Sequence, residues 1–499
     1  MNPTTQTSEF YELIDRKLFF GNPEILGAQI SPDGQFIAFI KPFNDVRNIW
    51  VKRRAEPFEN SRLLTNESLR PVPGFFWSRD SRFILYLKDE NGNENFNVFA
   101  VDPNAVPVDS ELCPGAINLT NSAEVQTQIY SLPKSEPDFI YIGANERDRS
   151  WHDLYKVQIS TGKKTLVWQN TDRLTRFVFD NKGEFRIAMR ANESGETEML
   201  RFDGREFVKI YSCGVFETCD PIRFHKEDKL LYIRTNKGER NLMQLVLFDP
   251  ETAREISFEQ DPESRVDLKD AGFSEATDEL IYTTYEDDKV RRYWKNPDFE
   301  KDYAWLSENL SGKQIEITSI SRDDNLWTVV AASDIEPGET YLFDRNRRVL
   351  DLQYRIREKL PRELLSTMKP IRYASSDGLE IPGYLTLPNG STPVELPLIV
   401  VPHGGPWYRD VWGYNAFAQF LSNRGYAVLQ MNFRGSTGFG KTFIDAGNKE
   451  WGGLMQDDIT WGVKHLIEKG IADENRVGII GESYGGYATL AAVTFTPDL

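Results

Sequence analysis

Short apolar strands separated by polar turns repeat along the first two thirds of the chain. Seven apolar segments follow one another, and their leading residues lie 47, 56, 46, 45, 50 and 46 positions apart. These segments are residues 36–39, 83–86, 139–142, 185–188, 230–233, 280–283 and 326–329. A period of about 45 residues with four short strands per unit is typical of β-propeller blades. The pattern therefore predicts a seven-bladed β-propeller over residues 26–352.

Turns and later strands within the units support this prediction. The turn Ser31-Pro32-Asp33-Gly34 precedes the first segment, and similar turns occupy residues 78–81 and 321–324. A second apolar strand follows in most units, for example at residues 48–51, 97–101 and 341–343. Because a blade cannot bury its faces alone, neighbouring blades should stack around a channel. The sixth unit fits least well, since residues 291–294 make a poor strand.

The pattern changes on both sides of this repeat. Apolar residues at helical spacing in 11–20 predict an N-terminal helix within residues 1–25, packed on the C-terminal domain. A polar, charged stretch at 354–368 predicts another helix. Beyond it, strands expected at 384–388, 398–401, 427–432 and 477–480 alternate with helices expected at 416–424 and 457–469. This alternation predicts a parallel sheet covered by helices in residues 353–499.

The pentapeptide Gly481-Glu482-Ser483-Tyr484-Gly485 lies between the last of these strands and a helix expected at 487–493. Gly-x-Ser-x-Gly between a strand and a helix is the nucleophile elbow of an α/β-hydrolase. We therefore expect Ser483 to be a nucleophile and the backbone N–H of Tyr484 to be an oxyanion donor. The second donor should be the N–H of Gly405, in the glycine-rich loop at 401–406.

The partners of Ser483 are not evident in the sequence. In this fold the acid and the histidine follow the serine, but only 16 residues follow Ser483 and none is a histidine. Of the four histidines, His403 precedes Ser483 and should shape its loop, while His152, His225 and His465 are expected to have structural roles. We therefore expect the chain to be a piece of a longer enzyme, inactive by itself, with the strand at 477–480 left at a sheet edge.

Three motifs together resemble the prolyl oligopeptidase family, most closely its acylaminoacyl-peptidase-like branch. They are Val-Pro-His-Gly-Gly-Pro-Trp-Tyr-Arg-Asp at 401–410, Asn-Phe-Arg-Gly-Ser-Thr-Gly-Phe-Gly at 432–440 and Gly-Glu-Ser-Tyr-Gly-Gly-Tyr at 481–487. The resemblance implies a seven-bladed β-propeller followed by a partial α/β-hydrolase domain. It also implies a serine peptidase for short peptides, with Ser483 as nucleophile and the backbones of Gly405 and Tyr484 as oxyanion donors. The propeller would exclude folded proteins from the active site.

Composition and charge narrow the classes of partner. A net charge of −17 argues against nucleic-acid binding, which needs a clustered basic face. The N-terminus does not resemble a signal peptide and no apolar run is long enough for a membrane span, so we expect a cytoplasmic protein without a membrane partner.

The three cysteines, Cys113, Cys213 and Cys219, are expected to be reduced, although the last two could pair across a hairpin. No metal or cofactor is expected, and the oligomeric state is left open, a homo-oligomer included.

Two alternative functions remain at this point. The first is a binding protein, in which the propeller engages a partner and a hydrolase remnant is only structural. The second is an esterase or lipase, because the elbow is shared by many acyl-transfer enzymes. The sequence leaves open both the residue preference and whether an acylated residue, a dipeptide or an internal fragment is released.

Overall fold

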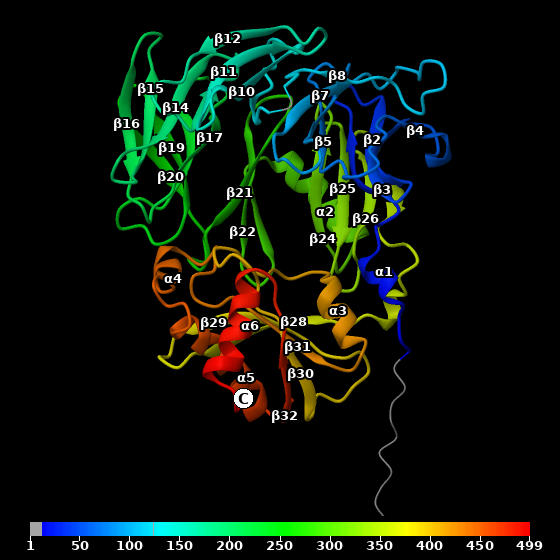
Figure 1. Ribbon diagram of the computed structural model, residues 1–499, viewed down its shortest axis with the longest axis vertical. Helices are drawn as coiled ribbons and strands as arrows, with labels where there is room; N and C mark the ends of the chain where they lie inside the picture. The colour runs from blue at the N-terminus through cyan, green and yellow to red at the C-terminus, as the bar shows by residue number, and fades with distance from the viewer. Residues whose placement is uncertain (1–11, 123) are drawn as a thin grey trace, which may run out of the picture.

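The computed structural model describes residues 12–122 and 124–499, which form two stacked units (Figure 1). A ring of β-sheets lies above a smaller unit that combines one mixed sheet with helices. Within the described residues the ring consists of seven separate sheets. The predicted seven-bladed β-propeller is therefore confirmed, and so is the α/β-hydrolase domain that follows it.

The first four blades are antiparallel sheets of four strands, with the strands paired in chain order. They comprise β1 (Leu26–Ile30), β2 (Phe36–Phe43), β3 (Val46–Arg53), β4 (Arg62–Leu63), β5 (Phe75–Trp77), β6 (Ile84–Lys88), β7 (Asn97–Val101), β8 (Ile117–Asn118), β9 (Thr127–Ser131), β10 (Phe139–Asp148), β11 (Trp151–Gln158), β12 (Lys164–Trp168), β13 (Arg176–Phe179), β14 (Phe185–Ala191), β15 (Thr197–Phe202) and β16 (Phe207–Cys213). A short 3₁₀ helix, η1 (Phe58–Asn60), precedes β4.

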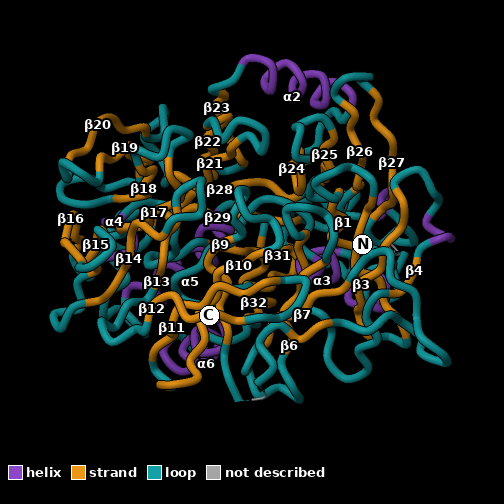
Figure 2. The backbone as a smooth tube through the Cα atoms, turned by 90° about the horizontal axis from the view of Figure 1, so that it is seen from above, coloured by secondary structure: helices purple, strands orange, loops and turns teal. Residues whose placement is uncertain are grey.

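Blades 5 and 7 also have four strands, whereas blade 6 has three. Their strands are β17 (Cys219–Phe224), β18 (Leu231–Thr235), β19 (Gln244–Asp249), β20 (Arg254–Glu259), β21 (Leu268–Phe273), β22 (Leu280–Glu286), β23 (Val290–Trp294), β24 (Gln314–Ile320), β25 (Leu326–Ala332), β26 (Glu339–Asp344) and β27 (Val349–Arg355). The segment 291–294, which looked like a poor strand, pairs with β22 as part of β23. The helix α2 (Pro297–Asn309) follows β23 and lies at the outer rim of the ring (Figure 2).

The seven apolar segments of the repeat are the second strands of their blades and not the first. An additional strand precedes each of them, from β1 before β2 to β24 before β25. These leading strands have mixed burial, as in β1 and β24, whereas β2 and β25 are almost continuously buried. Most leading strands are interrupted by polar residues, so the hydrophobic pattern alone did not reveal them; β5 and β13 are exceptions, with the apolar runs Phe-Phe-Trp and Phe-Val-Phe.

The ring closes by contact between its first and last blades. Neither blade contains a strand from the other end of the chain: blade 1 consists of β1–β4 and blade 7 of β24–β27. The Ser319 hydroxyl of β24 accepts a 2.9 Å hydrogen bond from the Ile30 N–H of β1. The Arg322 N–H donates to the Pro32 carbonyl at 2.8 Å. Ile30 and Ile37 also share an apolar cluster with Leu326. Polar and apolar contacts therefore both join blade 7 to blade 1.

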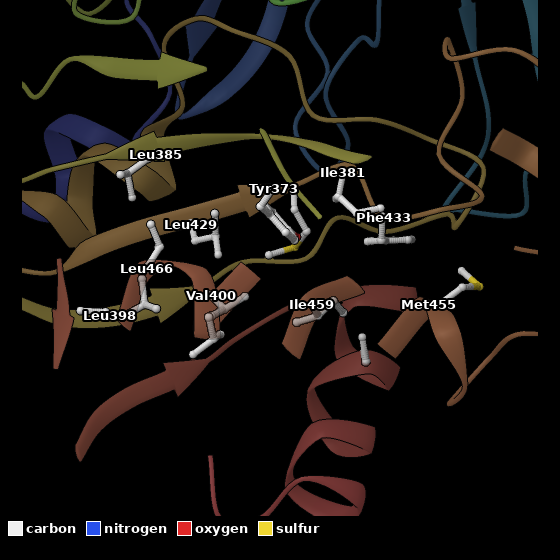
Figure 3. Close-up of a cluster of buried hydrophobic side chains, with 14 of the residues drawn as sticks. Tyr373, Ile381, Leu385, Leu398, Val400, Leu429, Phe433, Met455, Ile459 and Leu466 are labelled. Atoms are coloured by element: carbon white, nitrogen blue, oxygen red, sulfur yellow. The ribbon is translucent and has the colours of Figure 1, made fainter. Parts of the chain in front are cut away.

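The hydrolase domain contains one sheet with strand order β28-β29-β31-β30-β32. Its elements are β28 (Met368–Ala374), β29 (Glu380–Thr386), β30 (Leu396–Val400), α3 (Ala416–Ser422), β31 (Ala427–Met431), α4 (Lys441–Asp445), α5 (Leu454–Glu468), β32 (Ala472–Ile479) and α6 (Tyr484–Phe495). The strands β31, β30 and β32 are parallel, and β32 lies at the sheet edge as expected. Leu429 of β31 and Val400 of β30 face Ile459 and Leu466 of α5 in the domain core (Figure 3).

The prediction of a helix at 354–368 is wrong. Residues up to Arg355 belong to β27, which pairs with β26, and only the 3₁₀ turn η2 (Arg362–Leu364) follows before β28. The N-terminal helix α1 (Arg16–Phe20) is shorter than predicted, because the side chain of Asp15 caps it through the Lys17 N–H, and Tyr11 lies outside the described residues. Its Phe20 ring packs 5.3 Å from that of Phe420 on α3.

The expectation of reduced cysteines is also wrong for two of the three. Cys213 ends β16 and Cys219 begins β17, and the two form a disulfide with their Cα atoms 5.9 Å apart. This separation lies in the usual range for a disulfide, and sequence spacing alone did not establish it. Cys113 remains a free thiol.

The propeller contacts the hydrolase domain along one side of the ring. Arg409 donates to the Glu286 carbonyl at 2.8 Å, Arg372 pairs with Asp287 at 2.8 Å, and the Met368 N–H donates to Asp334. Among the described residues other than Asn93, every hydrogen bond and ion pair that residues 357–499 form with the propeller or the N-terminal segment involves residues 217–336 or that segment. None comes from blades 1–4.

A search of the described helices finds none with the length and hydropathy of a membrane span. The cytoplasmic location stays a prediction, and the oligomeric state stays open.

Candidate active site

Ser483 lies at a tight turn between β32 and α6. Its backbone has φ 56° and ψ −123°, a left-handed conformation that L-residues other than glycine rarely adopt. A Cβ added to Gly481 would lie 2.4 Å from the carbonyl carbon of Gly485, so the turn requires glycine there. The Ser483 side chain is exposed at the start of α6. The sequence-predicted strand–turn–helix geometry is therefore present.

The glycine-rich loop 401–406 lies directly against this turn. A Cβ on Gly485 would come within 2.2 Å of the Pro402 carbonyl oxygen, which shows how closely the two backbones approach. A Cβ on Gly404 would lie 3.4 Å from the Ser483 Cβ and 3.9 Å from its hydroxyl oxygen. Gly405 has φ 115°, which favours glycine, and it precedes a cis peptide bond to Pro406. The fold thus brings the loop and Ser483 together.

Two backbone N–H groups beside Ser483 have no acceptor. Among the hydrogen bonds of the described residues, neither the Gly405 N–H nor the Tyr484 N–H acts as a donor. Tyr484 is the first residue of α6, where backbone N–H groups are unpaired and the helix dipole favours negative charge. Both sequence-predicted donors are therefore free to bind an anion.

His403 is held within its own loop and does not serve Ser483. Its ring stacks on Phe433 at 4.3 Å between centroids, and burial lowers the pKa of His403 to about 4. Nδ1 lies 2.7 Å from the Gly404 carbonyl oxygen, and Nε2 lies 2.8 Å from the Ser436 hydroxyl. A carbonyl oxygen only accepts and a neutral imidazole has one N–H, so Nδ1 donates to Gly404. The single proton of the Ser436 hydroxyl is shared between Nε2 and the Phe433 carbonyl oxygen, which lies 2.6 Å from the hydroxyl.

The contact with His403 fixes the orientation of the peptide between Gly404 and Gly405, which carries the unpaired Gly405 N–H. The Gly404 carbonyl points to the His403 ring. Because C=O and N–H point in opposite directions across a trans peptide, the Gly405 N–H points away from that ring. The sequence motif included Ser436, but no signal in the sequence indicated that it orients His403.

A buried ion pair supports the loop that contains Ser436. Arg434 is 2% exposed, and its guanidinium pairs with Asp458 of α5 at 2.8 Å and with Asp377 at 2.9 Å. Burial raises the pKa of Asp458 against the effect of Arg434, whereas the Arg434 hydrogen bonds lower the pKa of the more exposed Asp377 to about 2. The pair joins the loop after β31 to α5, a link that sequence reasoning missed.

Aromatic side chains surround the start of α6. The Trp451 ring lies 4.9 Å from that of Tyr484 and 5.3 Å from that of Tyr487. Trp407 and Tyr408, in the segment after Gly405, have 66% and 63% of their surface exposed. These rings offer apolar contact surface to a substrate near Ser483.

The other three histidines lie elsewhere. His152 and His225 belong to blades 3 and 5, and His465 stacks on Tyr373 at 5.8 Å. Over residues 12–122 and 124–499, no group of three or more histidine, cysteine or acidic side chains could hold a metal ion.

Known proteins resemble this chain over nearly its full length. Dipeptidyl aminopeptidase BIII of Pseudoxanthomonas mexicana is 34% identical over 500 residues, which cover 98% of this chain and 70% of that protein. Dipeptidyl peptidase family member 6 of Caenorhabditis elegans is 29% identical over 526 residues, covering 98% of this chain and 69% of that protein.

A solved prolyl endopeptidase structure superimposes with a TM-score of 0.71 at 15% identity, and the match covers 97% of this chain and 72% of that one. The profile of the prolyl oligopeptidase family matches residues 412–499. The extended similarity to the bacterial aminopeptidase, on the same architecture, shows that the chain belongs to the prolyl oligopeptidase family of serine peptidases.

Proposed function

We propose that Ser483 is the nucleophile of a peptidase that cleaves short peptides through an acyl-enzyme. The observation that carries this proposal is the left-handed backbone of Ser483, which exposes its hydroxyl between β32 and α6. A serine held in this way is the nucleophile elbow of α/β-hydrolases. In the acylation step the hydroxyl oxygen attacks the scissile carbonyl carbon and the C–N bond breaks. The amine leaves with the proton that the hydroxyl has given up.

The free N–H groups of Gly405 and Tyr484 support an oxyanion site beside Ser483. Donors that are already oriented stabilise the negative charge that develops on the carbonyl oxygen in the transition state. Loss of one such donor typically slows an enzyme by about 10²–10³-fold. His403 orients the Gly405 donor through the Gly404 carbonyl and is not proposed as the base. In this fold the acid and base follow the serine, and we assign neither.

Peptides with a free amino terminus are the proposed substrates, with release of a dipeptide. The names of the two relatives that match 98% of this chain describe dipeptidyl peptidases. The propeller, which covers the hydrolase domain, would admit short peptides and exclude folded proteins. Family membership favours this activity over an esterase or a pure binding protein.

Labelling with a fluorophosphonate tests the role of Ser483. In protein that also supplies the base, the probe should modify Ser483, as peptide mass mapping would show, and Ser483→Ala should abolish the label. Ser376→Ala, at an exposed serine on another loop, serves as the matched control and should retain it. Labelling that persists in Ser483→Ala would contradict the proposal.

A set of nitroanilide substrates tests the mode of cleavage. The assay uses untreated protein from a preparation in which Ser483 has been shown to react with the probe. Ala-Ala-nitroanilide should be cleaved faster than its N-acetyl form and faster than acetyl-Ala-nitroanilide. Preference for acetyl-Ala-nitroanilide would instead indicate an acylaminoacyl peptidase. Equal cleavage of the free and acetylated dipeptides would indicate an oligopeptidase that does not recognise the amino terminus.

A further inference from the structure

A cavity of about 560 Å³ lies in the seam between blades 6 and 7. Its walls come from β21, β22 and β23 of blade 6, from β24 and β25 of blade 7, and from α2 and Trp412. Blade 6 has three strands, and α2 lies at the outer rim between blades 6 and 7 (Figure 2). The volume is within the range of small-molecule sites, about 300–1,000 Å³.

Arg292 brings a positive charge to this cavity and forms no ion pair with a carboxylate among the described residues. Its guanidinium carbon lies 4.6 Å from the ring centroids of both Tyr282 and Tyr303, and Nη1 donates to the Ile315 carbonyl at 3.3 Å. Within the described chain, Arg292 forms no ion pair, and its buried Nε has no hydrogen-bond partner. A guanidinium that is held between rings, with donors to spare, is suited to a carboxylate.

Glu316 brings the opposite charge to the same cavity. It follows Ile315 on β24, its side chain is exposed, and over residues 12–122 and 124–499 it forms neither an ion pair nor a side-chain hydrogen bond. The remaining charged groups of the wall are already paired: Lys269 with Glu286 at 2.9 Å, and Lys313 with Glu339. One guanidinium and one carboxylate are therefore left for a ligand.

Apolar surface completes the site. Trp294, Val330 and Trp412 line the cavity together with the two free charges. We infer that the seam between blades 6 and 7 binds a short zwitterionic peptide with an apolar side chain. Its carboxylate binds Arg292, its ammonium group binds Glu316, and its side chain packs on Trp294. This binding site goes beyond the proposed hydrolysis and does not involve Ser483.

Calorimetric titration of the Ser483→Ala protein tests the inference without cleavage of the ligand. The probes are Leu-Leu, N-acetyl-Leu-Leu, which lacks the ammonium group, and Leu-Leu amide, which lacks the carboxylate. Leu-Leu should bind about tenfold more tightly than either blocked form, because each lost ion pair leaves a protein charge unpaired. Absence of Leu-Leu binding, or equal binding of all three probes, would overturn the inference.

Variants in the same background separate this site from the substrate cleft. Glu316→Gln should abolish the preference for Leu-Leu over N-acetyl-Leu-Leu, and Arg292→Gln should abolish the preference over the amide. Glu308→Gln and Arg205→Gln, at exposed positions, are matched controls and should keep both preferences. If both preferences persist in Glu316→Gln and Arg292→Gln, the peptide binds elsewhere and the inference fails.

One further variant covers the case in which Arg292→Gln does not fold. Arg292→Lys retains the charge between the tyrosine rings but lacks the planar fork that binds a carboxylate with two hydrogen bonds. It should weaken Leu-Leu binding at least about threefold and leave binding of the amide unchanged. Unchanged binding of Leu-Leu would count against a carboxylate at Arg292. Because these titrations do not use Ser483 chemistry, their failure would leave the proposed peptidase function intact.

Discussion

The Ser436 hydroxyl lies 2.8 Å from Nε2 of His403, although the two residues are 33 positions apart in the chain. Together with the stacked Phe433 ring, this contact holds a buried, neutral imidazole beneath the loop that faces Ser483. The stability of the loop should therefore depend on the protonation state of His403.

The free energy of unfolding should fall as the pH decreases from about 6.5 to about 4. The pKa of His403 is lowered to about 4 by burial, whereas an unfolded histidine has its usual value near 6.5. The unfolded state therefore binds more protons in this window, and the contribution of neutral His403 is complete above it. The loss should be of the order of 3 kcal/mol. Urea unfolding at several pH values should show a shallower slope for His403→Gln and the wild-type slope for His225→Gln. An unchanged slope in His403→Gln would contradict this assignment.

Arg434→Met should destabilise the hydrolase domain by about 3–5 kcal/mol, because it leaves the fully buried carboxylate of Asp458 without its cation. Asp377→Asn removes the other partner of Arg434, but Asp377 is 43% exposed, so its loss should cost no more than about 1 kcal/mol. Urea midpoints of the two variants measure the difference. Equal destabilisation would show that the buried pair has no special role.

The Cys213–Cys219 disulfide should contribute about 2 kcal/mol to stability, since it closes a short loop in the unfolded chain. The double variant Cys213→Ser/Cys219→Ser should unfold at lower urea concentration, whereas Cys113→Ser should not. A thiol reagent added to the urea-unfolded protein without reductant should titrate one thiol. Three reactive thiols would show that the disulfide is absent.

Gly485→Ala should destabilise the elbow by about 1–3 kcal/mol, because its Cβ would lie 2.2 Å from the Pro402 carbonyl oxygen. Gly486→Ala is the matched substitution, with its nearest neighbour at 3.3 Å, and should be tolerated. Thermal unfolding and the rate of fluorophosphonate labelling measure the two effects. Equal values for the two variants would argue against the close approach of loop and elbow.

The propeller was predictable from sequence because strands such as β2 and β25 are buried almost throughout and recur at a steady period. Leading strands such as β1 and β24 have mixed burial and therefore give no continuous hydrophobic signal. The expected helix at 354–368 failed for two reasons. Its first two residues pair with β26 as the end of β27. The rest is interrupted by Arg357, which has φ 54°, and by Pro361, which cannot continue a helix from the preceding turn.

The elbow was predictable because the motif itself contains the two glycines that the turn needs. A Cβ on Gly481 would meet Gly485 within the turn, and a Cβ on Gly485 would meet Pro402 of the facing loop. The links from Ser436 to His403 and from Arg434 to Asp458 join separate elements, so no local pattern reveals them. The free charges of Arg292 and Glu316 were equally hidden, since only the folded seam shows which neighbouring charges are already paired.

The attachment of the propeller along one arc has a mechanical consequence. Blades 5 to 7 and the N-terminal segment provide the polar bonds to the hydrolase domain. If the propeller tilts relative to the hydrolase domain, this arc is the axis of the rotation. The distance between the two units would then change most on the opposite side, beneath blades 2 and 3.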